Sequence, residues 1–328
     1  MMKLFGFLPL VVAVFLLSFA VSALSGLFLI PRLRRLKIGQ TVREEGLKSH
    51  YAKNGTPTMG GLLFLTAMVV VGVPLTLAGY NLWPYMLVTL GCGLVGFADD
   101  WIKVVRKHNK GVSGRQKMMA LGLVAFLFVT WCLLGGTDIR NLVIPFVGMG
   151  APWTAPFWLA GALGVFILLA FTNGVNLTDG VDGLAGSVTL VALTVMGVLF
   201  SFRPELDSAR LFSALMAGGV LGYLLYNIHP AKVFMGDTGS LALGGAVSSV
   251  AIASGMPFLF ILVGIVYVVE DLSVMIQVFW FKRTGRRVFL MAPVHHHFEM
   301  VGWKENKIVW VFSGVGILFG LLALLASQ

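Results

Sequence analysis

The sequence predicts an all-α fold, a polytopic integral membrane bundle of about ten transmembrane helices. Hydrophobic residues make up 58% of the 328 positions and charged residues 12%, whereas a soluble domain carries about 25% charged residues. Runs of 18 or more apolar residues recur along the chain, each long enough to cross about 30 Å of hydrocarbon as a helix. Because these runs are continuous and do not alternate every second residue, a helical bundle is favoured over a transmembrane barrel.

The predicted spans are distributed over the whole chain. Residues 4–30 at first resemble a signal peptide, but the run is too long for one, and the basic stretch 31–37 follows in place of a small-residue cleavage site. It is therefore interpreted as the first retained span. No repeat or long linker divides the sequence, so 1–328 is predicted to form a single transmembrane domain. Hydropathy places the ten spans near 4–30, 59–79, 83–101, 118–136, 157–175, 184–202, 209–228, 239–255, 257–281 and 306–327.

The basic residues gather on one side of this predicted topology. The segments 31–58, 99–117, 229–238 and 282–307 fall on the same side and hold 20 of the 24 Lys and Arg residues. By the positive-inside rule this side is cytoplasmic, and an even number of spans puts both termini outside, in the periplasm. The same side holds 11 of the 14 acidic residues. Because acidic residues contribute little to topology, their one-sided distribution indicates a functional site.

The net charge of +10 does not indicate a nucleic-acid partner, because the basic residues border apolar spans. Anionic head groups of the lipid bilayer or an anionic substrate are the expected partners, and no nucleic acid is expected. The two cysteines, Cys92 and Cys132, lie in apolar segments and indicate neither a disulfide framework nor a zinc site.

Two adjacent carboxylates, Asp99 and Asp100, stand at the end of the third predicted span. Like charges side by side repel each other, and a divalent cation or a shared proton would relieve that repulsion. Lys103 and Lys107 follow within two helical turns, so a helix would present acids and then cations along one stripe. A solvated helix end with i,i+4 ion pairs explains the same residues without a function.

A second polar segment, NGVNLTDGVDG at 173–183, interrupts the chain where the fifth span ends. Asp179 and Asp182 each precede a glycine, which is typical of an exposed turn whose backbone and side chains can approach a ligand. An ordinary polar loop is the alternative, with Asp182 as the N-cap of the next helix.

The segment FMGDTGS at 234–240 has a glycine on either side of Asp237 and Thr238. Such a tight turn can direct backbone N–H groups and one carboxylate at a common point, as phosphate and metal sites require. The same residues also fit a simple helix start, with Asp237 or Ser240 as the cap.

Three consecutive histidines, His295, His296 and His297, lie in the last cytoplasmic segment. On a helix they would point in three directions, which argues against a three-histidine zinc site. Donation of their N–H groups to a phosphate or diphosphate is the functional interpretation, and a solvated loop is the alternative.

The segment KNGTPTMGG at 53–61 leads into the second span. Lys53 before a Gly, Thr and Pro turn can hold an anion, although the pattern is not that of a P-loop. Positive-inside lysines are also expected here without any such role.

Two further acids, Glu270 and Asp271, lie far inside the apolar run of the ninth span. They indicate either a break in that span or a misplaced span edge. The five polar motifs all fall on one side of a topology that was derived without them. Gathered carboxylates with glycine turns indicate Mg²⁺, the basic residues indicate a phosphate substrate, and the membrane setting indicates a lipid reactant.

These motifs resemble those of the bacterial phospho-N-acetylmuramoyl-pentapeptide transferase family, within the polyprenyl-phosphate N-acetylhexosamine-1-phosphate transferase superfamily. The resemblance covers almost the whole chain, and the motifs occur in the family order. MAPVHHHFE points to the muramoyl-pentapeptide branch, and Trp101 after the Asp pair is a modest variation. The matching strings are KNGTPTMGG at 53–61, FADDWIKVVRK at 97–107, NLTDGVDGLA at 176–185, FMGDTGS at 234–240 and MAPVHHHFE at 291–299.

The resemblance implies an enzyme that transfers phospho-MurNAc-pentapeptide from UDP-MurNAc-pentapeptide to undecaprenyl phosphate with Mg²⁺. The products are UMP and undecaprenyl-diphospho-MurNAc-pentapeptide, or lipid I, so this is the first membrane step of peptidoglycan synthesis. The family also implies a homodimer in the bacterial cytoplasmic (inner) membrane, with the active site facing the cytoplasm.

The resemblance further implies a role for each matching residue. Asp99, Asp100 and Asp237 are the catalytic acids. Asp237 and Asp179 are the metal ligands, and Asp99 deprotonates or orients the lipid phosphate. Substrate-binding roles fall to Lys53, Thr58, Lys103, Lys107 and Lys117 on phosphates, to Asn176, Asp179, Asp182, Phe234, Gly236 and Gln277 around the nucleotide, and to His295, His296 and His297 on the diphosphate.

Two other functions fit parts of the sequence. A polyprenyl-phosphate GlcNAc-1-phosphate transferase shares the Asp-Asp and Asn-x-x-Asp-Gly elements, and donor competition separates it from the first assignment. A cation transporter would place its acids within spans near the bilayer midplane, whereas here only Glu270 and Asp271 do so.

Overall fold

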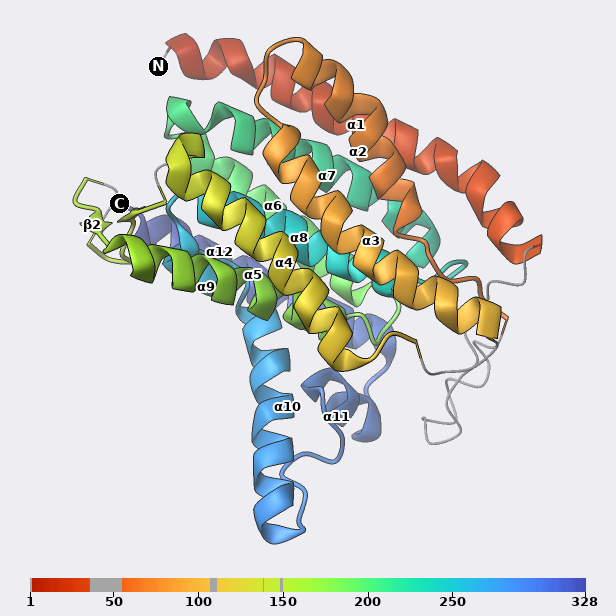
Figure 1. The fold of residues 1–328 in the computed structure, drawn as a ribbon. Coiled ribbons are helices and arrows are strands. Elements are labelled where there is room, and N and C mark those ends of the chain that lie inside the picture. Colours follow the sequence, from red (N-terminus) through yellow and green to blue (C-terminus); the bar gives the residue numbers. More distant parts are fainter. Residues whose placement is uncertain (1, 36–54, 107–110, 138, 148–149) are drawn as a thin grey trace.

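The computed structural model describes residues 2–35, 55–106, 111–137, 139–147 and 150–328, with the backbone alone for residues 2–6. Helices dominate these residues (Figure 1). The elements are α1 (Met2–Arg35), α2 (Leu62–Leu77), α3 (Trp83–Arg106), α4 (Gly114–Trp131), η2 (Cys132–Gly136), β1 (Asn141–Leu142), β2 (Trp153–Thr154), α5 (Phe157–Thr178), α6 (Leu184–Phe200), η3 (Pro204–Leu206), α7 (Asp207–Asn227), α8 (Gly236–Ala253), α9 (Pro257–Val263), α10 (Ile265–Thr284), α11 (Val294–Met300) and α12 (Glu305–Ala326).

The prediction of an all-α, multi-pass membrane protein is confirmed. Each predicted span coincides with a helix, or, for the ninth, with the pair α9 and α10. Length and composition make five helices of the described residues able to cross a membrane, or six if α9 and α10, bent by 82°, count as one span. The helices α2 and α6 are shorter and apolar. Ten spans and periplasmic termini stay predictions.

Helix α8 occupies the centre of the bundle and packs against α3 and α5. All of its residues except Asp237 are buried. Its sequence is rich in Gly, Ala and Ser, which let neighbouring backbones approach closely in a membrane bundle. A Cβ added to Gly96 of α3 would lie 2.0 Å from the carbonyl oxygen of Asp237. The close contact of α3 with the start of α8 therefore requires glycine at position 96.

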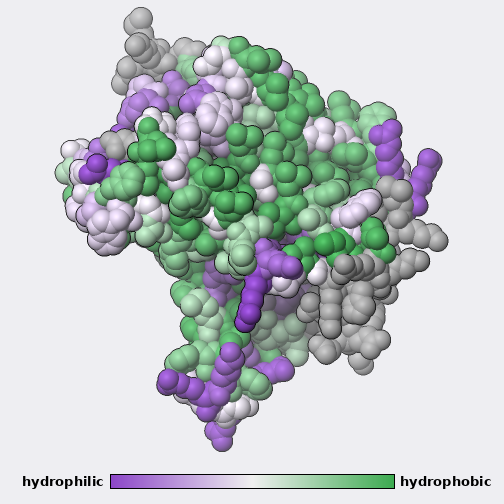
Figure 2. Space-filling model, in the orientation of Figure 1, coloured by the Kyte–Doolittle hydropathy of each residue, from purple (hydrophilic) through white to green (hydrophobic). Residues whose placement is uncertain are grey.

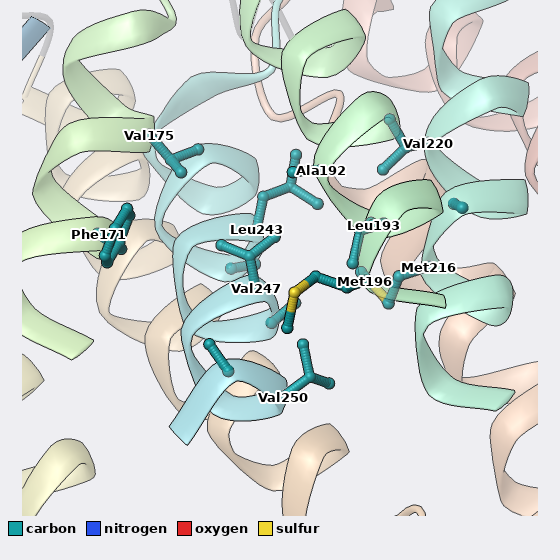
Figure 3. Close-up of a cluster of buried hydrophobic side chains, with 14 of the residues drawn as sticks. Phe171, Val175, Ala192, Leu193, Met196, Met216, Val220, Leu243, Val247 and Val250 are labelled. Atoms are coloured by element: carbon teal, nitrogen blue, oxygen red, sulfur yellow. The ribbon is translucent and has the colours of Figure 1, made fainter. Parts of the chain in front are cut away.

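The apolar core lies between α5, α6, α7 and α8. Figure 3 shows Phe171 and Val175 of α5 on one side of Leu243, Val247 and Val250 of α8. Residues of α6 and α7 cover the other side, with Leu193 and Met196 facing Met216 and Val220. This packing fixes α8 relative to both neighbours, and so fixes the position of the polar residues at its start.

Helix α10 projects away from the other helices, with the short α11 beside it (Figure 1). The bend that sets its direction lies at Gly264, between α9 and α10. The sequence indicated either a break in this span near Glu270 and Asp271 or a misplaced span edge, and the structure has a bend one to two turns earlier. Figure 2 shows hydrophilic residues gathered at the tip of this projection, where Lys282 and Arg283 end α10.

Candidate active site

Three carboxylates meet between the end of α3 and the start of α8. One oxygen from each of Asp99, Asp100 and Asp237 lies within 4.8 Å of the others. Asp99 is 1% exposed and Asp100 is 2% exposed. Two motifs that the sequence separates by more than 130 residues therefore form one acidic cluster, hereafter the acid cluster.

Asp100 is the residue of the acid cluster that holds α8 in place. Its Oδ1 accepts a hydrogen bond from the backbone N–H of Asp237 at 3.2 Å. Its Oδ2 accepts from the backbone N–H of Thr238 at 2.9 Å and from the Thr238 hydroxyl at 2.7 Å. These N–H groups belong to the first turn of α8, where the chain has no carbonyl partners for them. The sequence proposed Asp237 or Ser240 as the cap, and that alternative is wrong, because the cap comes from another helix.

The turn that leads into α8 rests on the segment before α2. The N–H of Gly60 donates to the carbonyl of Phe234 at 2.7 Å, and the N–H of Phe234 donates to the carbonyl of Pro57 at 2.8 Å. Gly236 has φ +71°, and a Cβ there would lie 2.6 Å from both Asp100 Oδ2 and Thr58 Oγ1. Glycine is therefore needed both for the backbone conformation and for the space. Thr58 is buried, and Phe234 is half-buried.

Two lysines neutralise the acid cluster. The ammonium of Lys103 contacts Asp99 and lies 3.1 Å from Asp237 Oδ2. Lys117, from α4, donates to the same Asp237 oxygen at 2.7 Å and lies 3.6 Å from Asp99 Oδ2. Three helices thus contribute charges to one point.

These contacts set the ionisation of Lys103 and Asp237, which lie outside the predicted spans. Burial works to lower the pKa of Lys103, but the neighbouring Asp237 and Asp99 raise it above its usual value. Burial works to raise the pKa of Asp237, but Asp99, Lys103 and Lys117 hold that pKa well below its usual range. Both groups are therefore charged at neutral pH.

The remaining contacts orient the acids. Val112, just before α4, donates its N–H to Asp99 Oδ1 at 2.7 Å. Asn176, in the last turn of α5, donates to Asp237 Oδ1 at 2.8 Å and to Ser240 Oγ at 2.8 Å. Asp99 and Asp237 are thus held by hydrogen bonds as well as by charge. The predicted role of Asn176 in the nucleotide pocket stays a prediction.

Asp182 belongs to a second group of side chains. Its Oδ2 accepts from the N–H of Ala231 at 3.1 Å and lies 3.0 Å from His229 Nδ1. Glu305, at the start of α12, accepts from the backbone N–H of Asp182 at 3.1 Å. The N-cap position of α6 is Gly183, which carries no side-chain cap. The interpretation of Asp182 as that cap is therefore wrong.

Asp179 ends α5 as its C-cap residue. Among the described residues, two groups of acids and histidines converge closely enough to share a cation, and Asp179 is in neither. The structure thus brings Asp237, but not Asp179, into the acid cluster. The role of Asp179 as a metal ligand stays a prediction. Lys53 and Lys107 lie outside the described residues.

The three histidines lie on the helix α11 and have three different partners. His295 is fully buried, and its Nδ1 lies 3.1 Å from Oε2 of the equally buried Glu270, at ion-pair distance without hydrogen-bond alignment. His296 Nδ1 lies 2.5 Å from Glu299 Oε2. His297 accepts the N–H of Leu290 on Nδ1 at 3.2 Å.

Sequence reasoning noticed Glu270 but gave it no partner. A charged residue in an apolar run was the available signal, and the contact with His295 depends on the bend before α10. A Cβ on Gly180 would lie 2.2 Å from His295 Nε2, so this imidazole also packs directly against the loop after α5. Asp271 accepts from Asn173 Nδ2 at 3.2 Å. Glu270 therefore joins α10 to α11, and Asp271 joins it to α5.

Gln277 fastens the segment after α10 back onto that helix. Its Oε1 accepts from the N–H groups of Val288 and Phe289, both at 3.0 Å. Its Nε2 donates to the carbonyl of Phe289 at 3.1 Å. This residue orders the chain that leads into α11, whereas the sequence predicted it in the nucleotide pocket. That prediction is not tested by these contacts.

The chain is similar to known proteins over most of its length. The model of glycosyl transferase family 4 matches residues 82–255, and phospho-N-acetylmuramoyl-pentapeptide-transferase signature 1 matches residues 53–65. The phospho-N-acetylmuramoyl-pentapeptide-transferase of Acetivibrio thermocellus is 50% identical over 317 residues, covering 97% of this chain and 95% of the relative.

Two further relatives carry the same name. That of Geobacillus kaustophilus is 47% identical over 312 residues, covering 94% of both chains. That of Shouchella clausii is 46% identical over 313 residues, covering 94% of this chain and 95% of the relative. Identity at this level over nearly the full length confirms the predicted resemblance, and the chain belongs to the phospho-N-acetylmuramoyl-pentapeptide-transferase family.

Proposed function

We propose that this chain transfers phospho-MurNAc-pentapeptide from UDP-MurNAc-pentapeptide to undecaprenyl phosphate. A phosphate oxygen of the lipid forms a bond to the sugar-linked phosphorus of the donor. The bond between the two phosphates of the donor breaks, and UMP leaves with its electron pair. The products are lipid I and UMP, so the enzyme carries out the first membrane step of peptidoglycan synthesis.

The observation that carries this proposal is the acid cluster with its two lysines. Phosphoryl transfer depends chiefly on positioning and on neutralising charge around the transferring group. Two acids and two lysines from three helices meet at one point. They are Asp99 and Lys103 of α3, Lys117 of α4 and Asp237 of α8. Acids of this kind at helix ends suit a lipid phosphate at head-group depth. The name of the relatives, phospho-N-acetylmuramoyl-pentapeptide-transferase, supports the choice of the transferred group.

The residues present fit a Mg²⁺ ion. Mg²⁺ takes carboxylate oxygens as ligands and usually binds through one or two of them together with substrate phosphates. Here the ammonium groups of Lys103 and Lys117 contact the carboxylates of Asp99 and Asp237, which shows that the cluster attracts cations. Asp237 and Asp99 would hold the ion, because their oxygens face the lysine cations that a metal would replace, whereas both oxygens of Asp100 accept hydrogen bonds from the start of α8. When bound, Mg²⁺ neutralises charge on the diphosphate.

The other roles, positioning the acids and binding the substrates, fall to the chain's own residues. Asp100 positions the start of α8, and Asn176 orients Asp237. Asp99 orients or deprotonates the lipid phosphate, and Lys103 and Lys117 move from the acids to the phosphates of the substrates. The proposed substrate contacts also include Lys53, Thr58 and Lys107 on phosphates, Asp179, Asp182, Phe234, Gly236 and Gln277 around the nucleotide, and His295, His296 and His297 on the diphosphate.

The location follows from charge. Because 20 of 24 basic residues fall on the side of the acid cluster in the predicted topology, this side faces the cytoplasm of the bacterial inner membrane. A soluble nucleotide donor reaches the site from there. The assembly is proposed to be a homodimer, and a single domain is proposed for 1–328.

Purified protein in detergent, supplied with Mg²⁺ and undecaprenyl phosphate, tests the function by its release of UMP. UDP-MurNAc-pentapeptide should give UMP, and UDP-GlcNAc should give none. Turnover with UDP-GlcNAc alone would reassign the chain to the GlcNAc-1-phosphate branch, and turnover with neither donor would refute both transferase assignments. A matched reaction without undecaprenyl phosphate measures background hydrolysis of the donor.

A further inference from the structure

Arg210 is a buried cation in an apolar setting. It lies in the first turn of α7 and is 5% exposed. Its Cζ lies 5.6 Å from the centre of the Phe7 ring. Among the described residues no carboxylate forms a hydrogen bond or a close ion pair with its guanidinium, and Asp207, three residues away, interacts with it only as a nearby charge. Burying a charge without a hydrogen-bonded partner is costly, so this guanidinium can gain from binding a further anion.

The guanidinium lines a groove of about 350 Å³ between α1, α6 and α7. The three helices present residues at i, i+3, i+4 and i+7 spacing, so each contributes one continuous face. These faces are apolar or small except for Arg210 and two hydroxyls. The lining is Leu8, Val11, Val12 and Phe15 of α1, Leu193, Thr194, Gly197, Val198 and Ser201 at α6, and Arg210, Ala214 and Ala217 of α7.

The groove has a charged group at one end and an apolar lining along the rest, as a phospholipid has a charged head group and apolar chains. Arg210 is three residues from the start of α7, roughly 5 Å along the helix axis, whereas Ala217 is roughly 10 Å deeper. The charged group is thus at the rim, at the depth of head groups, and the apolar part runs inward. By contrast, the groove of about 360 Å³ between α2 and α3, which Leu62 and Phe97 line, has no charged side chain in its lining.

This groove is separate from the acid cluster. Asn227, at the opposite end of α7, binds the N–H of Gly183 next to the active-site loop, and Arg210 is roughly 25 Å from it along the helix. A ligand on Arg210 therefore does not touch the residues proposed to act in transfer, and this site does not depend on that function.

We propose that the groove binds one anionic phospholipid, with the head-group phosphate on Arg210 and an acyl chain along α1, α6 and α7. A guanidinium binds phosphate with two parallel hydrogen bonds, and the apolar faces cover the chain. The phosphate supplies a directly hydrogen-bonded anion, which no carboxylate of the described residues gives to Arg210. A bound lipid should therefore hold α1 against α6 and α7.

The test compares lipids of equal acyl chains on delipidated protein in detergent. Native mass spectrometry counts bound phosphatidylglycerol and phosphatidylcholine, and thermal unfolding reports stabilisation. Wild type should retain one phosphatidylglycerol in preference to phosphatidylcholine. Arg210→Gln should lose this preference, with half-saturation at about tenfold higher phosphatidylglycerol concentration, equal to about 1.4 kcal/mol. Arg210→Lys keeps the charge but loses the paired geometry, so it should retain an intermediate preference.

Two variants complete the design. Gly197→Leu fills the groove, where a Cβ would meet only Ser213 at 3.9 Å, so it should release the retained lipid while leaving Arg210 in place. Arg203→Gln is the matched control, because Arg203 lies at the same end of the bundle but donates to Glu205. It should behave as wild type.

Three outcomes would overturn the proposal. Equal retention of both lipids by wild type would make the groove a nonspecific acyl surface. A phosphatidylglycerol preference that persists in both Arg210→Gln and Gly197→Leu would place the lipid elsewhere. If both variants instead convert a wild-type dimer to monomer regardless of added lipid, a second copy of the chain is the occupant. Should Arg210→Gln fail to fold, Arg210→Lys and Gly197→Leu still decide between these results.

Discussion

Asp100 and Thr238, separated by 138 positions in the chain, are joined by two hydrogen bonds to one carboxylate oxygen, from the Thr238 N–H at 2.9 Å and from its hydroxyl at 2.7 Å. A residue at the end of α3 therefore caps α8. The negative charge also lies at the positive end of the α8 dipole. This contact fixes where Asp237, in the first turn of α8, meets Asp99.

Replacing Asp100 by Asn should destabilise the protein and lower turnover together. Asparagine keeps one oxygen but turns its NH₂ toward donors, so at least one buried N–H loses its partner at a cost of about 2 kcal/mol. Thermal unfolding of the detergent-solubilised protein measures the loss. Thr238→Val, which removes one bond to the same oxygen, should cause a smaller decrease. An Asp100→Asn protein as stable as wild type would contradict the capping role.

Asp99→Asn and Asp237→Asn should each abolish UMP release while the folded membrane protein is still recovered. Both acids face the cations of the cluster, and neither caps a helix. Size-exclusion chromatography checks the fold of each variant, and the transfer assay checks its rate. Near-normal turnover by either variant would refute the role given to that carboxylate.

Replacing Lys117 by Met should change Mg²⁺ binding and turnover in opposite directions. The ammonium of Lys117 competes with a metal for Asp237, so its loss should tighten Mg²⁺ binding by about tenfold. Turnover should fall, because a cation for the substrate phosphates is lost. Calorimetry measures the first effect and UMP release the second. Arg115→Gln, an exposed cation two residues away, is the control. Weaker Mg²⁺ binding in Lys117→Met would count against competition.

Gly96→Ala should lower both activity and stability. The added Cβ would lie 2.0 Å from the carbonyl oxygen of Asp237, so α8 must move away from α3, at a cost of about 1–3 kcal/mol. Gly122→Ala on α4 is the matched control, since its Cβ would meet nothing within 4 Å. That variant should be neutral or more stable by up to about 1 kcal/mol. Equal behaviour of the two variants in thermal unfolding would show that the contact with Asp237 does not matter.

Glu270→Leu and His295→Leu should each destabilise the protein. The double variant should lose less stability than the sum of the two single losses. Both side chains are fully buried and face each other at 3.1 Å. Removing one leaves the other buried without its partner, at a cost of about 1–3 kcal/mol. A double-mutant cycle of thermal stability measures the coupling. Asp271→Asn, which keeps a partner in Asn173, serves as control. Strictly additive losses would mean that the pair does not act as a unit.

Much of the site was predictable because its residue types are unusual in their setting. Two adjacent aspartates at the end of an apolar run, and an aspartate between glycines, are costly unless they act on a ligand or a partner. The pattern indicated Asp99, Asp100, Asp237, Lys103 and Asn176 as site residues, and the structure brings these five together. It did not indicate Thr238, Ser240 or His229, since single hydroxyls and a lone histidine carry no signal in the sequence.

The sequence by itself determined the class of protein and the segments that form helices, because hydropathy and charge act locally along the chain. Only the tertiary structure decided which contacts each residue of the motifs makes. Asp100 accepts the N–H groups of α8, whereas its neighbour Asp99 faces Lys103. Glu270 reaches His295 because α10 bends at Gly264. Such contacts depend on the packing of distant helices, and small residues such as Gly96 set the distances at which those helices meet.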